Sequence, residues 1–476
     1  MNRLIIFLLL SAISTFSFAQ ESWDLRKCVD YALENNISIK QQDIQAKIAE
    51  LTYKQSNLSK FPSFNLSGNL SMNTGRSIDR TTNLYTTQSV MNNYFSLQSN
   101  VDLFNWFNKT NTIAGNKLEA ESASASVQGV KDDISLNVAA AFLEALLAKE
   151  QLNASKSQIE LTTAQLENTK KLVRAGSLPE LNQLQIESQL ANDSSTLISA
   201  IGTETQSLLL IKSLLNLDAG LDFHITAPPV ELIPVDPIAE LQPEAVYLLA
   251  MRSLPKQKVR NLHLEAARKF AAAAKGAMYP SVGMGFSIGS NYSNIKSNPM
   301  LISAIPNGLD TIGHVYGSNV PVVVPVYDKV YRVDASPYWT QISDNFSNAV
   351  GIGVSVPIFN GRSARTNWEK QKLNVRNLEL QQELDNKSLK QDIYKAYTDA
   401  MTALQKFNAS TKAVETAQKA YDFSTKRYTV GLLSTIDLLI SQNNLFRAKI
   451  DRLSAQYTYV FKMKVLEYYK GQGIKL

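Results

Sequence analysis

The stretch that decides the fold is 427–442, which reads RYTVGLLSTIDLLISQ. Residues 431–445 match residues 176–190, which lie 255 positions earlier (431 − 176 = 255). Upstream, 356–360 matches 101–105 at the same offset (356 − 101 = 255). Because both landmarks keep their spacing without an insertion, the chain is one unit written twice.

A heptad pattern fills the chain between those landmarks. Positions 138, 145, 152, 159, 166 and 173 are Val, Ala, Leu, Ile, Leu and Val, and Ala, Ala, Ser, Thr and Thr stand at 141, 148, 155, 162 and 169. The second copy repeats the pattern from Ile393 to Tyr428. A heptad sustained for five repeats predicts a helix from about 109 to 175, roughly 100 Å long at 1.5 Å per residue. Flanking helices are predicted at about 24–58, 178–216, 244–277 and 433–469.

Short alternating segments precede each long helix. Apolar residues alternate with polar ones over 63–73 and 95–104, and with glycine or serine over 282–288 and 350–358. Alternating segments of about ten residues are typical of membrane β-barrel strands. A half-buried sheet in a soluble β-sandwich is the alternative. Four strands cannot close a barrel, and an open edge in lipid leaves backbone groups unsatisfied, so strands in a membrane would require several chains to share one barrel.

The composition excludes several classes of protein. Of 476 residues, 44% are hydrophobic and 19% charged, which argues against wholesale disorder. The mean hydropathy of −0.15 argues against a polytopic helical membrane protein. One cysteine, Cys28, and three histidines predict no disulfide, no metal site and no cofactor. The net charge of +6 is interspersed along the chain, so no nucleic-acid partner is expected. No nucleophile–base pair or phosphate-binding motif is present, so the chain is predicted not to be an enzyme.

The ends and the middle of the chain predict its organisation. Residues 1–19 have the charge, apolar run and small residues of a secretory signal peptide, with cleavage after Ala19. The first repeat is predicted at 20–226 and the second at 244–476. Between them, 227–243 holds five of the fifteen prolines and predicts a stiff, extended linker. The second copy has a longer insert between Pro280 and Phe346, whereas the first joins its strands through 74–93. Because long loops are typical of the extracellular side, this insert is expected outside the cell.

These features together resemble the TolC-like outer-membrane efflux family. The most specific match is 427–442, which is similar to the family's RY-x-x-G-x-x-x-x-x-D-x-L-x-x-Q turn. Weaker matches are WDL at 23–25, ALENN at 32–36 and FNG at 359–361. The first copy departs from the pattern, since Asn182 stands where the second has Asp437.

The resemblance implies a mixed α+β fold of mainly long α-helices. Each chain would be the tandem-repeat protomer of a homotrimer, with a twelve-stranded β-barrel in outer-membrane lipid that continues into a periplasmic α-helical barrel. It implies an exit duct of a tripartite efflux or type I secretion system for small molecules or polypeptides. A periplasmic adaptor (membrane fusion) protein would connect the duct to an inner-membrane transporter. The alternatives are an exported coiled-coil structural or adhesin-like surface protein, and an exported hydrolase, for which acid/base residues are lacking.

The two turns carry the candidate sites. Gly176 and Gly431 are predicted helix C-terminal glycines in the left-handed conformation. Ser177 with Glu180, and Ser434 with Asp437, are predicted capping boxes that start the return helices. The resemblance implies that the tips contact the adaptor, through Ala175, Gly176, Ser177, Val430, Gly431 and Leu432. It also implies that Asp437, with Tyr428 nearby, lines a periplasmic gate. A capping role alone is the alternative for Asp437.

Overall fold

A computed structural model describes residues 23–78, 83–226, 230, 233–295 and 298–471. The predicted signal peptide, 1–19, lies outside the described residues, as does part of the predicted linker. Contacts divide the chain into two compact units. The helical unit contains Gly115–Arg268, Leu373–Leu476 and the N-terminal segment up to Thr52, and the strand-bearing unit contains Tyr53–Ala114 and Lys269–Lys372.

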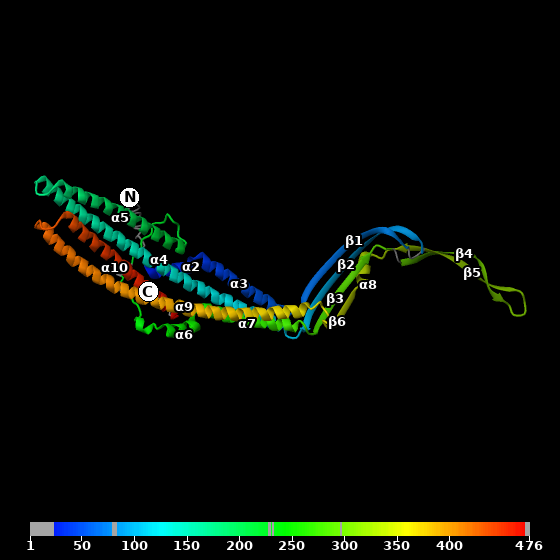
Figure 1. Cartoon of the computed structure of the whole chain (residues 1–476). Helices are drawn as coiled ribbons and strands as arrows, with labels where there is room; N and C mark the ends of the chain where they lie inside the picture. Colours follow the sequence, from blue (N-terminus) through cyan, green and yellow to red (C-terminus); the bar gives the residue numbers. More distant parts are fainter. Residues whose placement is uncertain (1–22, 79–82, 227–229, 231–232, 296–297, 472–476) are drawn as a thin grey trace, which may run out of the picture. The chain divides into compact units, whose positions relative to one another are not determined.

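The helices and strands follow one another in two similar series (Figure 1). The first series is α2 (Leu25–Asn35), α3 (Ile37–Leu58), β1 (Ser63–Ile78), β2 (Tyr85–Phe104), α4 (Asn108–Arg174) and α5 (Glu180–Leu215). After the short 3-10 helix η2 (Ile238–Glu240), the second series is α6 (Pro243–Ser253), α7 (Pro255–Gly276), β3 (Ser281–Ser293), β4 (Asn298–His314), β5 (Pro321–Asp334), α8 (Tyr338–Asp344), β6 (Ser347–Ser355), α9 (Ser363–Thr429) and α10 (Thr435–Tyr469).

Two helices that the sequence predicts as continuous are each interrupted once. Asn36 leaves the helical conformation, and its side-chain oxygen accepts from the Ser38 N–H at 2.9 Å, so it ends α2 and caps α3. Leu254 precedes Pro255 and is extended, because a proline disfavours the helical conformation of the residue before it. Pro255 is then the first residue of α7.

The heptad positions form the buried seam of the long helices. In α4, Val138 and Ala145 are fully buried, and the small residues Ser155, Thr162 and Thr169 are buried as well. In α9, burial is complete at Ile393 and Ala400. From Phe407 towards the end of α9 the seam positions are only half-buried. The seam prediction is therefore confirmed for α4, and α9 leaves part of its seam open in one chain.

The single cysteine lies in the core of the helical unit. Cys28 packs with Phe142 and Ile211, and none of its surface is exposed. Burial, more than the nearby Asp24 carboxylate, raises the pKa of the Cys28 thiol to about 12. The thiol is therefore protonated and protected from reagents at neutral pH.

Residues 234–236 of the predicted linker are hydrogen-bonded to α10. Lys464 donates to the carbonyl oxygen of Pro234 at 2.6 Å and pairs with Glu467 at 2.9 Å. Glu467 also accepts from the backbone N–H of Asp236 at 2.7 Å. Since Lys464 and Glu467 are almost fully buried, this ion pair holds 234–236 against the helix.

The strand-bearing unit contains a four-stranded antiparallel sheet in the order β1-β2-β3-β6. Among the described residues, the outer edges of β1 and β6 pair with no strand. Every residue of β6 is exposed, and so is nearly all of β1. The sheet of one chain is therefore open at both edges.

Three strand predictions are corrected by the structure. β1 and β2 have 16 and 20 residues, so most of the predicted connection at 74–93 is strand. Polar pairs extend the ladder there, for example Thr74 and Ser89, whose hydroxyls are 2.8 Å apart. β6 ends at Ser355, because Pro357 has no N–H for the ladder. Finally, the insert is not a simple loop, since it contains β4, β5 and α8.

Candidate functional site: the two helical turns and the groove between the return helices

Both turns reverse the chain through the same backbone motif. Gly176 has φ +71° and Gly431 has φ +76°. In the first turn, the N–H of Gly176 donates to Val173 at 2.9 Å and that of Ser177 donates to Leu172 at 2.8 Å. This pair of bonds is a Schellman motif, which satisfies the last carbonyls of a helix. The left-handed glycine prediction is therefore confirmed at Gly176.

The second turn repeats this pattern at the end of α9. The N–H of Gly431 donates to Tyr428 at 3.0 Å, and that of Leu432 donates to Arg427 at 2.9 Å. A Cβ built on Gly431 or on Gly176 meets no atom within 4 Å. The glycines are therefore required by the backbone conformation and not by lack of space.

A predicted serine cap is present only at the second turn. Ser434 is the N-cap of α10: its Oγ accepts from the Asp437 N–H at 3.2 Å and donates to the Asp437 carboxylate at 2.6 Å. The prediction for Ser177 is wrong, because Pro179 takes the N-cap position of α5 and no side chain caps that helix. Glu180 still lies in the first turn of α5, where its negative charge interacts favourably with the helix dipole.

The predicted contact and gate residues lie at these turns. Ala175, Gly176, Ser177, Val430, Gly431 and Leu432 are all exposed. Val430 and Leu432 expose about two thirds of their surface, which is unusual for two apolar residues so close together. Tyr428 is half-buried and accepts a hydrogen bond from the buried Thr435 hydroxyl at 3.3 Å, whereas Asp437, in the first turn of α10, is exposed.

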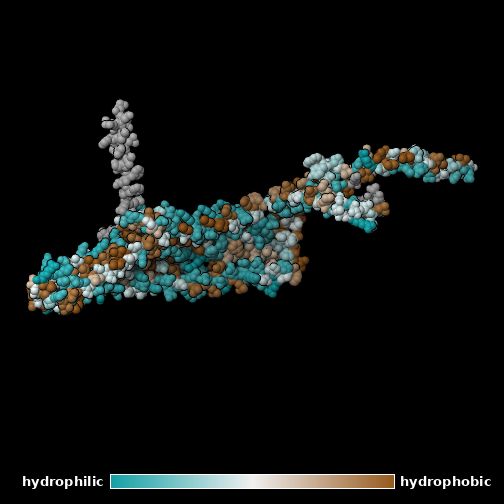
Figure 2. Space-filling view, turned by 90° about the horizontal axis from the view of Figure 1, so that it is seen from above, coloured by the Kyte–Doolittle hydropathy of each residue, from teal (hydrophilic) through white to brown (hydrophobic). Residues whose placement is uncertain are grey.

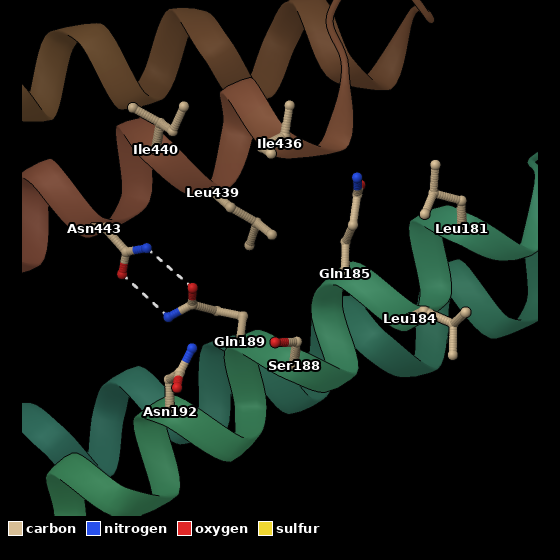
Figure 3. Close-up of a pocket in the computed structure, with 10 residues that line it drawn as sticks. All are labelled: Leu181, Leu184, Gln185, Ser188, Gln189, Asn192, Ile436, Leu439, Ile440 and Asn443. Carbon is tan, nitrogen blue, oxygen red and sulfur yellow. Dashed lines mark hydrogen bonds between the residues drawn. The ribbon is translucent and has the colours of Figure 1, made fainter.

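A groove runs between the first turns of the two return helices, α5 and α10 (Figure 3). It encloses about 440 Å³. Its lining residues are Leu181, Leu184, Gln185, Ser188, Gln189, Asn192, Ile436, Leu439, Ile440 and Asn443. Four of the apolar ones, Leu181, Leu184, Ile436 and Ile440, are more than half exposed. Figure 3 shows Gln189 and Asn443 facing each other across the groove, where they exchange two hydrogen bonds of 3.1 and 3.0 Å.

Behind the groove, a buried polar layer joins three helices. Asp193 of α5 accepts from Thr162 of α4 at 2.6 Å and from Gln189 at 2.7 Å. Gln158 of α4 donates to the same carboxylate at 3.4 Å, and Gln442 of α10 donates to Thr162 at 3.1 Å. Asp193 is only 6% exposed. Its carboxylate therefore accepts hydrogen bonds from three side chains of two helices.

Sequence reasoning did not identify the groove or this layer. The available signal was the repeat itself, since Leu181 and Leu184 correspond to Ile436 and Leu439 at the offset of 255. Within the described ranges, no group of three or more His, Cys, Asp or Glu side chains could hold a metal ion. None of the helices in the described part of the chain is both long and apolar enough to cross a membrane.

Comparison with known proteins identifies the family. The family model for outer membrane efflux proteins matches residues 28–217 and 255–466, which is most of the chain. The chain belongs to the outer membrane efflux protein family. The resemblance to TolC-like proteins is thus confirmed, and the chain is an outer-membrane protein.

Individual relatives are distant in sequence. The chain is 24% identical over 162 residues to the outer membrane protein TolC of Salmonella enteritidis, which is 33% of each protein. It is 21% identical over 375 residues to the outer membrane efflux protein BepC of Brucella suis, or 76% of this chain and 69% of that one. The alignments with TolC therefore span a third or less of the relative's length.

Solved structures share the fold over nearly the whole chain. The structure of CusC has a TM-score of 0.76 at 16% identity and covers 94% of this chain and 92% of CusC. The Campylobacter jejuni CmeC outer membrane channel has a TM-score of 0.73 at 16% identity, with 95% and 86% covered. Both of these structures are described as channels.

Proposed function

We propose that three copies of this chain form an outer-membrane exit duct. The observation that carries this proposal is the four-stranded sheet with β1 and β6 unpaired at its edges. Unpaired backbone groups in lipid cost several kcal/mol each, so a sheet in a membrane has to close. If β1 of one copy pairs with β6 of the next, three copies close a twelve-stranded barrel, and the paired edges differ, as a cyclic oligomer requires.

The helical unit supports the same assembly. The seam of α9 is only half-buried at Phe407, Val414 and Tyr421. Small residues alternate with these positions, among them Ser410 and Ala417, so a neighbouring helix could approach closely. Helices of neighbouring copies would cover this open seam and continue the duct as an α-helical barrel in the periplasm.

The trimer is tested directly by cross-linking. Protein extracted from outer membranes in detergent is treated with an amine-reactive cross-linker and separated under denaturing conditions. We expect a covalent species of three chains as the largest abundant product. A series that stops at monomers and dimers would contradict both the barrel and the duct.

We further propose that a periplasmic adaptor protein docks on the two turns. The support is an exposed apolar tip, Val430 and Leu432, and a groove that has exposed apolar residues and is bridged by the hydrogen-bonded pair Gln189 and Asn443. This arrangement suits the helical hairpin of a partner, whose apolar residues would fill the groove. The adaptor would link the duct to an inner-membrane transporter, which supplies small molecules or polypeptides as cargo.

The docking proposal is tested with two aspartate variants of equal charge. Gly431→Asp places a charge and a Cβ in the left-handed turn, and we expect loss of adaptor binding and of export while trimers still form. Gly202→Asp is the control, because Gly202 lies within α5, has open space around it and is distant in sequence from both turns. Normal export by the Gly431→Asp trimer would show that the turn is not the docking site.

The insert between β3 and β6 is proposed to lie outside the cell. It contains β4, β5 and α8, and its tip turn includes Asn319. A protease site inserted after Asn319 should be cleaved when intact cells are treated with the protease. The same site inserted at the tip turn after Gly176 should be cleaved only after the outer membrane is opened. Reversal of this pattern would overturn the orientation.

A further inference from the structure

The hairpin formed by β4 and β5, here called the ribbon, carries large apolar side chains on both of its faces, beside a few charged residues. Residues directly opposite one another in the register share a face, and successive residues of a strand alternate between faces. Face A contains Leu301, Leu309, Val323, Tyr327 and Tyr331, and face B contains Met300, Ile305, Val322, Val326 and Val330. All ten side chains belong to residues that are 38–69% exposed in one chain. Figure 2 shows hydrophobic stretches alternating with hydrophilic ones along the ribbon.

The described chain leaves both faces uncovered. β4 and β5 form a sheet of their own, with no third strand among the described residues. A two-stranded hairpin alone is at best marginally stable in water. Since exposed apolar patches of this extent mark interaction sites, a partner is needed to cover the ribbon.

The edges of the ribbon are poorly suited to strand addition. Pro306 lies in β4, and Pro321 and Pro325 lie in β5, and a proline offers no N–H to an adjoining strand. The register also shifts at three places, between Leu301 and Ser303, between Pro306 and Leu309, and between Thr311 and Gly313. Prolines and bulges are the devices by which edge strands avoid pairing with other chains. The partner should therefore contact the faces.

The charges of the ribbon are nearly balanced. The ribbon has three acidic residues, Asp310, Asp328 and Asp334, and two basic residues, Lys329 and Arg332. Arg332 pairs with Asp334 of its own strand at 2.6 Å. The register places Lys329 on face A and the other four charged residues on face B. Face A therefore has a net positive charge and face B a net negative charge, so face A of one copy can meet face B of the next without like-charge repulsion.

We propose that the ribbons of three copies pack face A against face B in a closed ring. The inference rests on the proposed trimer for the number of copies. An interface in a cyclic trimer uses two different surfaces of each chain, and the ribbon offers two different faces that both carry large apolar side chains. A single unrelated partner on one face would leave the other uncovered. The ring would stand where the insert begins, between the adjacent strands β3 and β6.

A pair of cysteines on opposite faces tests this arrangement. Val323→Cys lies on face A and Val326→Cys lies on face B. The double variant in isolated outer membranes is treated with a short bis-maleimide. We expect covalent dimers and trimers at about ten times the yield of either single variant, because face A of one copy meets face B of the next. Cys28 does not interfere, since it is fully buried.

A lysine placed on face A should disrupt the packing of face A against face B, and a lysine in the tip turn is its control. Tyr327→Lys, added to the cysteine pair, places a charge in the centre of face A and should abolish the covalent species. Ser318→Lys adds the same charge in the tip turn, away from both faces, and should leave the yield unchanged.

Two results would overturn the inference while leaving the duct intact. In the first, amine cross-linking yields trimers, but the cysteine pair stays monomeric and both thiols react freely with a bulky maleimide. In the second, the ribbon cysteines cross-link to a different protein, which would then be the partner. If amine cross-linking yields no trimers, the proposed function fails together with this inference.

Discussion

Asp437→Asn separates the two roles that remain for this carboxylate. Asp437 is exposed, and its side chain accepts a 2.6 Å hydrogen bond from Ser434, which caps α10. As a cap partner, the charge contributes through the helix dipole, at about 0.3–1 kcal/mol. Asparagine keeps an oxygen for the Ser434 hydroxyl, and the backbone N–H that donates to Ser434 is unchanged. The variant should therefore destabilise the tip only slightly.

As a gate residue, Asp437 would act in a ring of three. A carboxylate roughly 10 Å from the pore axis attracts a monovalent cation by about 0.4 kcal/mol in water, so three contribute about 1.2 kcal/mol. That is roughly an eightfold enrichment of cations over a neutral ring at low salt. Screening weakens it strongly, because the Debye length falls from about 10 Å at 0.1 M to about 3 Å at 1 M salt.

The assay is the reversal potential of trimers in planar bilayers under a KCl gradient, beside the melting temperature of the detergent-solubilised trimer. We expect Asp437→Asn to lower cation selectivity at low salt with little change at high salt. Ser434→Ala is the matched control, since it removes the cap at a cost of about 1 kcal/mol but keeps the charge. It should melt earlier with unchanged selectivity. If Asp437→Asn melts earlier and keeps its selectivity, the carboxylate is only a cap.

Five further substitutions have defined outcomes. Gly431→Ala should destabilise the tip by about 1–2 kcal/mol through its left-handed φ, whereas Gly202→Ala within α5 should stabilise by about 0.5–1 kcal/mol, both measured as melting temperatures. Lys464→Met should cost about 3–5 kcal/mol, because it leaves the buried Glu467 carboxylate without its cation; adding Glu467→Gln should recover part of this loss in denaturant unfolding. His263 donates to Glu119 at 2.8 Å, and this bond raises its pKa. The stability that this pair contributes is complete below the unfolded-state pKa of about 6.5, and it is lost as the pH rises through the higher folded-state pKa. The melting temperature should therefore fall above about pH 6.5, and this fall should be smaller in His263→Gln.

Features written in local sequence were predicted well. The heptads specified α4 and α9, because a coiled-coil seam requires apolar or small residues at fixed spacing. The two turn glycines were predictable because only glycine adopts φ near +70° without strain. The cap at Ser434 was also predictable, because it joins residues only three positions apart in sequence.

Features that depend on a neighbour or on a competing residue were missed. Pro179 displaced the predicted cap at Ser177, and Asn36 broke a helix without a proline to signal it. The ends of β1 and β2 are rich in Asn, Ser and Thr, so their strand character depends on cross-strand pairing such as Thr74 with Ser89. The hydrogen-bonded pair across the groove is formed by Gln189 and Asn443, which are 254 residues apart in sequence. No local pattern identifies such a pair.

The surfaces that one chain leaves open come in unlike pairs. The sheet has two free edges, β1 and β6, which belong to different strands. The ribbon has two apolar faces with different residues, face A and face B. Each of these surfaces can therefore meet its counterpart on another copy, β1 with β6 and face A with face B, and such a contact repeated around an axis leaves neither surface open. Two copies joined in this way would give a sheet of eight strands and three copies a sheet of twelve. The cross-linking experiments count the chains and so decide the size of the ring.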